Sequence, residues 1–227
     1  MNDIRLWQLI SPALPIGAYA YSQGFESAVE NQLITSEDQA YQWISGLLQQ
    51  SIGQLDSPIY LRLHQAWQSK QYDDLLYWHR YLQASRESSE FLSEDQQLGT
   101  ALLRLLKSLS DNEDKFFQAS IEQIKEIKKP SFLLIYTLAV VLWDIDKLAG
   151  LKGFLWSWCE NQVAAAIKLV PLGQTSGQIL LKKLMPAIDT VSSQAEAIVD
   201  ENIGSFSMGL SILSAKHEQQ YSRLFRS

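Results

Sequence analysis

A chain of 227 residues with 46% hydrophobic and 19% charged residues can bury a core without disulfides or structural metals. Its formal net charge of −6 argues against nonspecific nucleic-acid binding, which depends on clustered Lys and Arg. The single cysteine, Cys159, cannot form an internal disulfide and indicates a reducing compartment. The first residues lack the pattern of a secretory signal, and the longest apolar run, 132–143, is too short to cross a bilayer. We therefore expect a soluble, cytoplasmic protein with no membrane partner.

Residues 11–26, SPALPIGAYAYSQGFE, follow a short apolar helix signal but do not fit a regular helix themselves. The two prolines remove backbone donors and fix φ, and Gly17 and Gly24 permit turns that other residues resist. The segment also carries Tyr19 and Tyr21, aromatic side chains that a solvated linker would not hold. The pattern predicts an ordered loop that packs on the chain's own core or on a partner.

Helical signals recur along the rest of the chain, whereas strand signals hardly appear. Ser36 and Gln39 form a capping box, Ser57 is expected to cap a second helix with Pro58 at its first position, and Pro186 should kink or split the last helix. The helices are expected, in chain order, at 36–51, from 57 to at least 66, 72–81, 86–109, 112–125, 131–147, 151–169 and 174–199.

The segment 131–147 is apolar on most sides, which is typical of a helix at the centre of a bundle. Together these signals predict an all-α, single-domain bundle of roughly eight to ten helices over 1–227, with an extended C-terminal tail. The last segment loses strong periodicity, but Tyr221, Leu224 and Phe225 give it apolar groups to bury. Residues 201–227 are therefore expected to be a docking segment, one that could order only on a partner.

The sequence shows no short ligand spacing that would indicate a metal site. His64, His79 and His217 are widely separated, and Cys159 has no neighbouring ligand. His64 and His79 are expected to be surface or half-buried residues on helices. His217, near the end of the chain, is the histidine that could contact a metal or a partner.

The sequence contains no complete motif for nucleotide binding or for nucleophilic catalysis. The turn at 173–177 precedes a helix like a phosphate loop, but the lysine of a Walker motif is missing after Gly177. No G-x-S-x-G elbow is present, and the acidic pairs occur in patterns typical of helix caps and solvated faces. Acid–base residues could still converge from distant positions, so a helical enzyme with a composite active site remains an alternative.

Three segments together resemble one family, the urease accessory protein UreF. They are SPALPIGAYAYSQGFE at 11–26, KLVPLGQTSGQILL at 168–181 and HEQQYSRLFRS at 217–227. Their order and spacing agree with the family and with the all-α interpretation, so the resemblance covers essentially the full length of the chain.

The resemblance implies a maturation factor that is not an enzyme. Proteins of this family act with UreD (also called UreH) and the GTPase UreG to load nickel into apo-urease, and UreF is implied to dimerise and to bridge the other two. It also implies that this chain binds no cofactor itself, because its partners handle nickel and GTP. A direct nickel carrier is a further alternative.

The family's tail motif, carried over residue by residue, implies a partner-binding site. Arg223 and Arg226 would bind partner carboxylates. Tyr221, Leu224 and Phe225 would serve as buried anchors on UreD. The residues assigned to this site are His217, Glu218, Tyr221, Arg223, Leu224, Phe225 and Arg226.

The central motif implies that Lys168, Gln174 and Gln178 present polar contacts to the GTPase or to a second subunit, while Gly173 and Gly177 shape the turn. Internal hydrogen bonds that fix the turn are the alternative for these three polar residues. In the first segment, Tyr19 and Tyr21 are candidate partner contacts, with burial in the core as the alternative. Around 86–99 the family is usually more basic than this chain, which has an acidic pair there, so no role is carried over to that helix.

Overall fold

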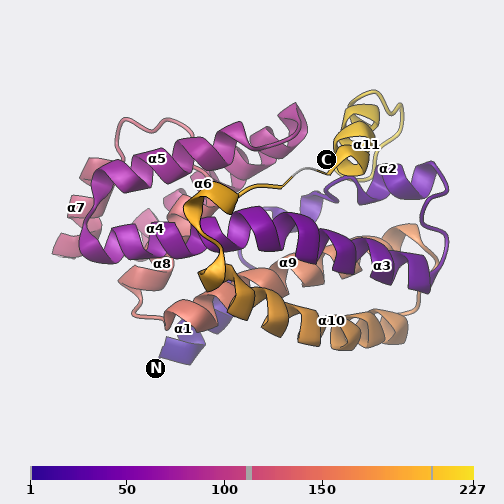
Figure 1. Cartoon of the computed structure of the whole chain (residues 1–227), viewed down its shortest axis with the longest axis horizontal. Helices are drawn as coiled ribbons and strands as arrows, with labels where there is room; N and C mark the ends of the chain where they lie inside the picture. Colours follow the sequence, from indigo (N-terminus) through magenta and orange to yellow (C-terminus); the bar gives the residue numbers. More distant parts are fainter. Residues whose placement is uncertain (1, 111–113, 206) are drawn as a thin grey trace.

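The computed structural model describes residues 2–110, 114–205 and 207–227, and these residues form helices without any strand (Figure 1). The prediction of an all-α bundle is therefore confirmed. The α-helices are α1 Asn2–Leu9, α2 Phe25–Glu30, α3 Glu37–Leu47, α4 Ser57–Ser69, α5 Tyr72–Ala84, α6 Ser89–Leu109, α7 Lys115–Gln123, α8 Phe132–Leu142, α9 Lys147–Leu169, α10 Gln174–Gln194 and α11 Met208–Glu218. None of the described helices is long and apolar enough to span a membrane.

Helix α8 forms the centre of the core, as its sequence predicts. Every residue from Leu133 to Val140 is buried, and the helix contacts α4, α6 and α9. Helix α8 carries apolar side chains on all of its faces. These side chains are removed from water only if other helices enclose α8 on every side. Helix α9 lies along α10 and also contacts α8 (Figure 1).

Helices α3 and α4 are joined by a π-helix, Leu48–Asp56, instead of the break that Ser57 and Pro58 predict. The prediction that Ser57 is an N-cap is wrong: Ser57 is itself helical, and its hydroxyl donates to Ile52 O at 3.0 Å. Pro58 has no N–H for the carbonyls of the preceding turn. One of them, Gln54 O, instead accepts from Gly204 N–H at 3.1 Å, which ties the π-helix to the segment before α11.

Helix α10 runs through Pro186 as one continuous element, so of the predicted kink or split the split does not occur. Pro186 lies on the exposed face of α10, where water can satisfy the carbonyl that loses its donor. On the opposite face, a Cβ at Gly177 would lie 2.4 Å from Ile167 Cδ1 of α9. Gly177 therefore allows α10 to approach α9 closely, and its role is in helix packing and not in the turn.

Two short elements depart from the predicted order. Asn112, where a helix was expected to begin, lies outside the described residues, and α7 begins after Asp114, whose carboxylate accepts from Phe117 N–H at 2.9 Å. Helix α2 was not predicted, since it lies within and just after the loop at 11–26. The expected extended tail is also partly helical, because 208–218 forms α11 and only 219–227 lacks helical structure.

Candidate functional site

The last nine residues, 219–227, fold back onto the chain's own N-terminal loop, and we call them the tail. Ser22 N–H donates to Ser227 O at 2.9 Å, and Arg226 N–H donates to Ala20 O at 2.8 Å. Figure 1 shows the end of the chain beside α2 and α11. The tail thus packs on its own chain, whereas the sequence left open whether it orders only on a partner.

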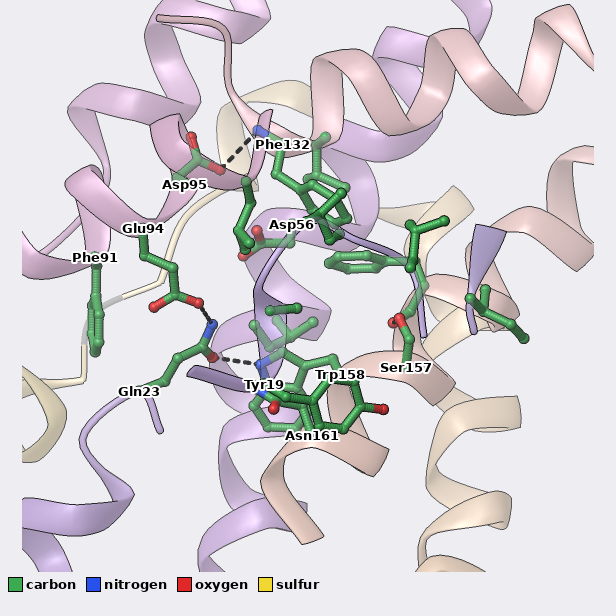
Figure 2. Close-up of a pocket in the computed structure, with 18 of the residues that line it drawn as sticks. Tyr19, Gln23, Asp56, Phe91, Glu94, Asp95, Phe132, Ser157, Trp158 and Asn161 are labelled. Atoms are coloured by element: carbon green, nitrogen blue, oxygen red, sulfur yellow. Dashed lines mark hydrogen bonds between the residues drawn. The ribbon is translucent and has the colours of Figure 1, made fainter. Parts of the chain in front are cut away.

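The loop that receives the tail has an unusual backbone at Gln23 and Gly24, which adopt positive φ angles of 52° and 80°. Positive φ strains a residue other than glycine, so the surroundings must hold Gln23 in place. Its side-chain Oε1 accepts from Trp158 Nε1 at 2.6 Å, and its Nε2 donates to Glu94 Oε1 at 2.6 Å (Figure 2). The strained turn is therefore anchored between α9 and α6.

Two amide side chains of α9 bind backbone carbonyls of the loop at 11–26. Asn161 Nδ2 donates to Tyr21 O at 3.0 Å, and Gln162 Nε2 donates to Ser22 O at 3.2 Å. Both amides are buried, so these bonds replace water for the loop carbonyls. The loop presents Ser22 to the tail in one fixed geometry.

Glu26, in the first turn of α2, accepts the backbone of the tail. Its Oε1 accepts from Leu224 N–H at 2.7 Å, and its Oε2 accepts from Phe225 N–H at 3.0 Å. A buried carboxylate needs such donors, because its desolvation is otherwise costly. Glu26 therefore acts as a cap for two tail amides.

His217, the last buried residue of α11, completes this cluster. Its Nε2 lies 3.1 Å from Glu26 Oε2, and its Nδ1 lies 2.9 Å from Glu90 Oε2 of α6. The other oxygen of Glu90 accepts from Arg223 Nη1 at 2.8 Å. We call Glu26, Glu90, His217 and Arg223 the tail cluster.

Glu94, one turn further along α6, binds the last residue of the chain. Ser227 Oγ donates to Glu94 Oε2 at 2.8 Å, opposite the bond from Gln23. Burial raises the pKa of Glu94 to about 7, although the bonds from Gln23 and Ser227 oppose this rise. Sequence analysis assigned no role to Glu94, yet it lies four residues before Leu98 and so on the buried face of α6.

A cavity of about 140 Å³ lies beneath the loop, between α6, α8 and α9 (Figure 2). Its lining is largely apolar, but Arg86 Nε, Asp95 Oδ2 and Asn161 Oδ1 are buried there without a hydrogen-bond partner among the described residues. A cavity with this volume and these polar groups has the room and the partners that ordered water requires.

A second charge cluster borders the cavity. Arg86 donates to Asp56 at 2.8 Å and to Asp95 at 3.2 Å, and Asp95 also accepts from Phe132 N–H at 3.2 Å. Burial raises the pKa of Asp95, and the charge of Arg86 opposes that rise. We call Arg86, Asp56 and Asp95 the inner cluster.

The tail residues predicted as partner contacts fall into two groups. His217 and Phe225 are buried within the chain, so Phe225 is an anchor for the tail itself. Tyr221 and Leu224 are exposed, and Arg226 is exposed beside them. Arg223 and Glu218 are also exposed, although Arg223 is paired with Glu90 and Glu218 accepts from Ser89 Oγ.

The two loop tyrosines also differ. Tyr21 is buried and donates from its hydroxyl to Gln97 Oε1 at 2.9 Å, which agrees with the core alternative. Tyr19 is half-buried and donates to Glu160 Oε2 at 2.8 Å. Burial, reinforced by Glu160, raises the pKa of Tyr19, so its hydroxyl remains a donor.

Lys168, Gln174 and Gln178 are all exposed. Neither glutamine makes a side-chain hydrogen bond to a residue that the structure describes, so neither fixes the turn in that way. Lys168 Nζ lies 5.3 Å from the centre of the Phe225 ring, within the range of a cation–π contact. This contact joins the central motif to the tail.

The other two histidines belong to the core and are not at the surface, which corrects the expectation for them. His64 and His79 are buried, and burial lowers the pKa of each to about 4. Within the described ranges, no group of three or more His, Cys, Asp or Glu side chains is placed to hold a metal ion.

The fold and this site define an all-α protein in which polar contacts join the N-terminal loop to the C-terminal tail. Residues 34–185 match the family model described as UreF. Curated proteins named "Urease accessory protein UreF" are similar over nearly the full length. The protein of Alkalilimnicola ehrlichii is 44% identical over 98% of this chain and 95% of its own. That of Teredinibacter turnerae is 44% identical over 100% of both, and that of Hahella chejuensis 41% identical over 99% and 97%. The chain belongs to the UreF family, as its three motifs predicted.

Proposed function

We propose that this chain is a urease accessory protein required for nickel insertion into apo-urease. Relatives that are 41% and 44% identical carry the name of urease accessory proteins, which supports this role. In the proposed mechanism the chain is a scaffold that bridges UreD (UreH) and the GTPase UreG. It is not an enzyme, and its partners handle nickel and GTP.

The observation that carries this proposal is the meeting of all three family motifs on one part of the molecule. The loop and the tail are joined by hydrogen bonds, and Lys168 of the central motif contacts the Phe225 ring. Leu169 lines the same surface pocket as Tyr221 and Leu224. A partner that recognises one motif would therefore meet the others as well.

Docking of the tail prepares its exposed side chains for a partner. Glu26 fixes the backbone of Leu224 and Phe225, so the exposed Leu224 side chain is held beside Tyr221. A preorganised surface loses less conformational entropy when it binds than a mobile segment does. We propose that Tyr221, Leu224 and Arg226 contact UreD.

The turn between α9 and α10 is proposed as the second contact. Lys168, Gln174 and Gln178 are exposed there, so they are available to recruit UreG. In this proposal the chain acts in the cytoplasm and forms a homodimer. Its contact with UreG would also change the rate at which UreG hydrolyses GTP.

The decisive test of the tail surface is the double variant Tyr221→Ala/Leu224→Ala. Both side chains are exposed, so the free energy of unfolding should change by less than about 0.5 kcal/mol. Binding to purified UreD should weaken by about tenfold or more, because aromatic and aliphatic anchors dominate interface energies. Deletion of 217–227 is a poorer test, since it also removes the buried His217 and Phe225.

A matched control is Tyr77→Ala, which removes an exposed tyrosine from α5, away from the tail. It should leave the affinity for UreD unchanged. Full affinity of the Tyr221→Ala/Leu224→Ala variant would show that the tail surface is not the UreD contact.

A further inference from the structure

The tail cluster places a fully buried histidine between two carboxylates. His217 has no exposed surface, and each of its ring nitrogens faces a glutamate oxygen, Glu26 on one side and Glu90 on the other. Glu26 comes from α2 and Glu90 from α6, so the ring joins both elements to the end of α11. The tail begins two residues later.

The hydrogen-bond inventory of this cluster requires two ring protons. Ionised carboxylates only accept, and a neutral imidazole has one N–H donor and one acceptor nitrogen. A neutral His217, which has no exposed surface, would direct a lone pair at a carboxylate oxygen about 3 Å away. The imidazolium form instead donates to both carboxylates, and such charge-assisted bonds are the stronger kind.

We propose that the tail is held in place by a protonated His217 and is released when the ring loses its proton. The same two carboxylates carry the remaining bonds of the tail: Glu26 accepts from Leu224 and Phe225, and Glu90 accepts from Arg223. Loss of the ring proton therefore removes the positive charge beside the buried Glu26 and leaves Glu90 paired with Arg223 alone. We call this contact between His217 and the two glutamates the latch. It lies within one chain, so it does not depend on which partners the chain binds.

The charged groups on the segments that meet at His217 are mostly acidic. Helices α2 and α6 are the elements that pack against α11. The charged side chains in the parts of these segments nearest the end of α11 are Glu26 and Glu30 of α2, Glu90 and Glu94 of α6, Lys216 and Glu218 of α11, and Arg223 and Arg226 of the tail. Glu87, in the turn before α6, accepts from Ser211 Oγ of α11.

The sign of the pH dependence follows from proton counting. A histidine exposed in an undocked tail is largely neutral above about pH 6.5. The docked state then holds one proton more than the undocked state, so the docking constant falls about tenfold per pH unit while that difference persists. Glu94, whose pKa burial raises to about 7, acts in the same direction. The experiment must therefore observe the His217 ring itself.

The ring can be observed directly in the full chain labelled with ¹⁵N-histidine, because the sequence contains three histidines. Long-range ¹H–¹⁵N spectra at pH 7.5 should show two neutral rings, His64 and His79, whose pKa values are lowered to about 4, and one imidazolium. His217→Gln should remove the imidazolium signal. A neutral His217 ring, with the Leu224 and Phe225 amides still protected from exchange, would overturn the proposal.

Amide exchange tests the release of the tail. In a Glu94→Gln background, the protection factors of Leu224 and Phe225 should fall about tenfold per pH unit over part of the range from pH 7 to 9. His217→Gln should lower this protection at pH 6.5 and remove the pH dependence, whereas Glu201→Gln, which changes an exposed glutamate outside the tail cluster, should keep it. Equal pH profiles with and without His217 would overturn the latch. If His217→Gln fails to fold, the ring spectrum of the unsubstituted chain decides alone.

Discussion

Helix α6 and the turn that leads into it contribute to two buried charge clusters that hold the molecule together in different ways. In the inner cluster, Arg86 joins Asp56 of the π-helix to Asp95, and Asp95 reaches Phe132 at the start of α8. In the tail cluster, Glu90 meets His217, which is 127 residues away in the sequence. The inner cluster fixes helices of the bundle to one another, whereas the tail cluster fixes the end of the chain to the bundle.

The cations of the two clusters explain the difference. The guanidinium of Arg86 stays charged at every physiological pH, and its planar fork can hold two carboxylates at once. An imidazole can lose its charge within that range. A bundle that must stay folded is therefore tied by arginine, and a tail that docks on the bundle is tied in part by histidine.

Arg86→Ala should produce the largest effect, because it leaves two buried carboxylates without their cation. The side chains of Asp56 and Asp95 are each 4% exposed. Removing one partner of a buried ion pair typically costs about 3–5 kcal/mol. Urea denaturation at pH 7 should show a loss of this size. The loss should shrink as the pH is lowered, since burial raises the pKa of Asp95 and protonation of its carboxylate removes the unpaired charge.

Arg62→Ala is the matched control for Arg86→Ala. Arg62 pairs with Asp200, whose side chain is 59% exposed, and exposed pairs contribute about 0–1 kcal/mol. If the two variants lose the same free energy of unfolding, the inner cluster does not have the structural role described above.

Glu94→Gln should have a smaller effect of the opposite sign. The pKa of Glu94 is raised from 4.5 to about 7 in the folded chain, so the folded state binds more protons between these values. Stability is therefore lost as pH rises from about 4.5 to about 7, and the loss is then constant, at most about 3 kcal/mol. Glutamine keeps the shape without the charge: its Oε1 can accept from Gln23 Nε2, and its Nε2 can donate to Ser227 Oγ. The variant should be more stable than the parent at pH 8 and nearly equal to it at pH 4.5.

Chemical denaturation at pH 4.5 and pH 8 checks this prediction. A change in stability that is the same at both pH values would mean that Glu94 is not buried as a charged group. A variant that is less stable at pH 8 would mean that the bonds from Gln23 and Ser227 outweigh the desolvation of the carboxylate.

The elements of this fold that sequence predicts are those set by local pattern. Helix α8 follows from an apolar surface on all sides, and the cap at Ser36 forms as expected, with its hydroxyl accepting from Gln39 N–H. The π-helix before Ser57 was missed because Ser-Pro usually opens a helix, and nothing local reveals that Gly204 takes up the carbonyl of Gln54.

The site divides in the same way. The three motifs identified the family, but they predicted neither that the loop and the tail meet nor which residues join them. Spacing along α6 could have placed Glu94 on a buried face, yet its bond to Ser227 spans 133 residues. The pairing of His217 with Glu26 spans 191 residues and depends on the path of the whole chain. Periodicity carries no information about contacts at such separations.

The smallest effect on stability is expected where Lys168 of α9 contacts Phe225 of the tail. Lys168→Ala removes one exposed cation–π contact, which contributes at most about 1 kcal/mol, and Gln174→Ala removes no hydrogen bond to a described residue. Both variants should nevertheless weaken the capture of UreG and the activation of urease if this turn recruits the GTPase. Lys182→Ala, an exposed lysine further along α10, is the control and should change neither.

These variants distinguish two roles of Lys168: contact with UreG and retention of Phe225 in the docked tail. If Lys168→Ala reduces UreG capture while Leu224 and Phe225 stay protected from exchange, the lysine acts on the partner and not through the tail. If protection and capture fall together, Lys168 acts by holding Phe225 in place. Unchanged urease activation in both Lys168→Ala and Gln174→Ala would contradict the proposed UreG contact, while the tail cluster, which depends on neither side chain for its hydrogen bonds, would stand.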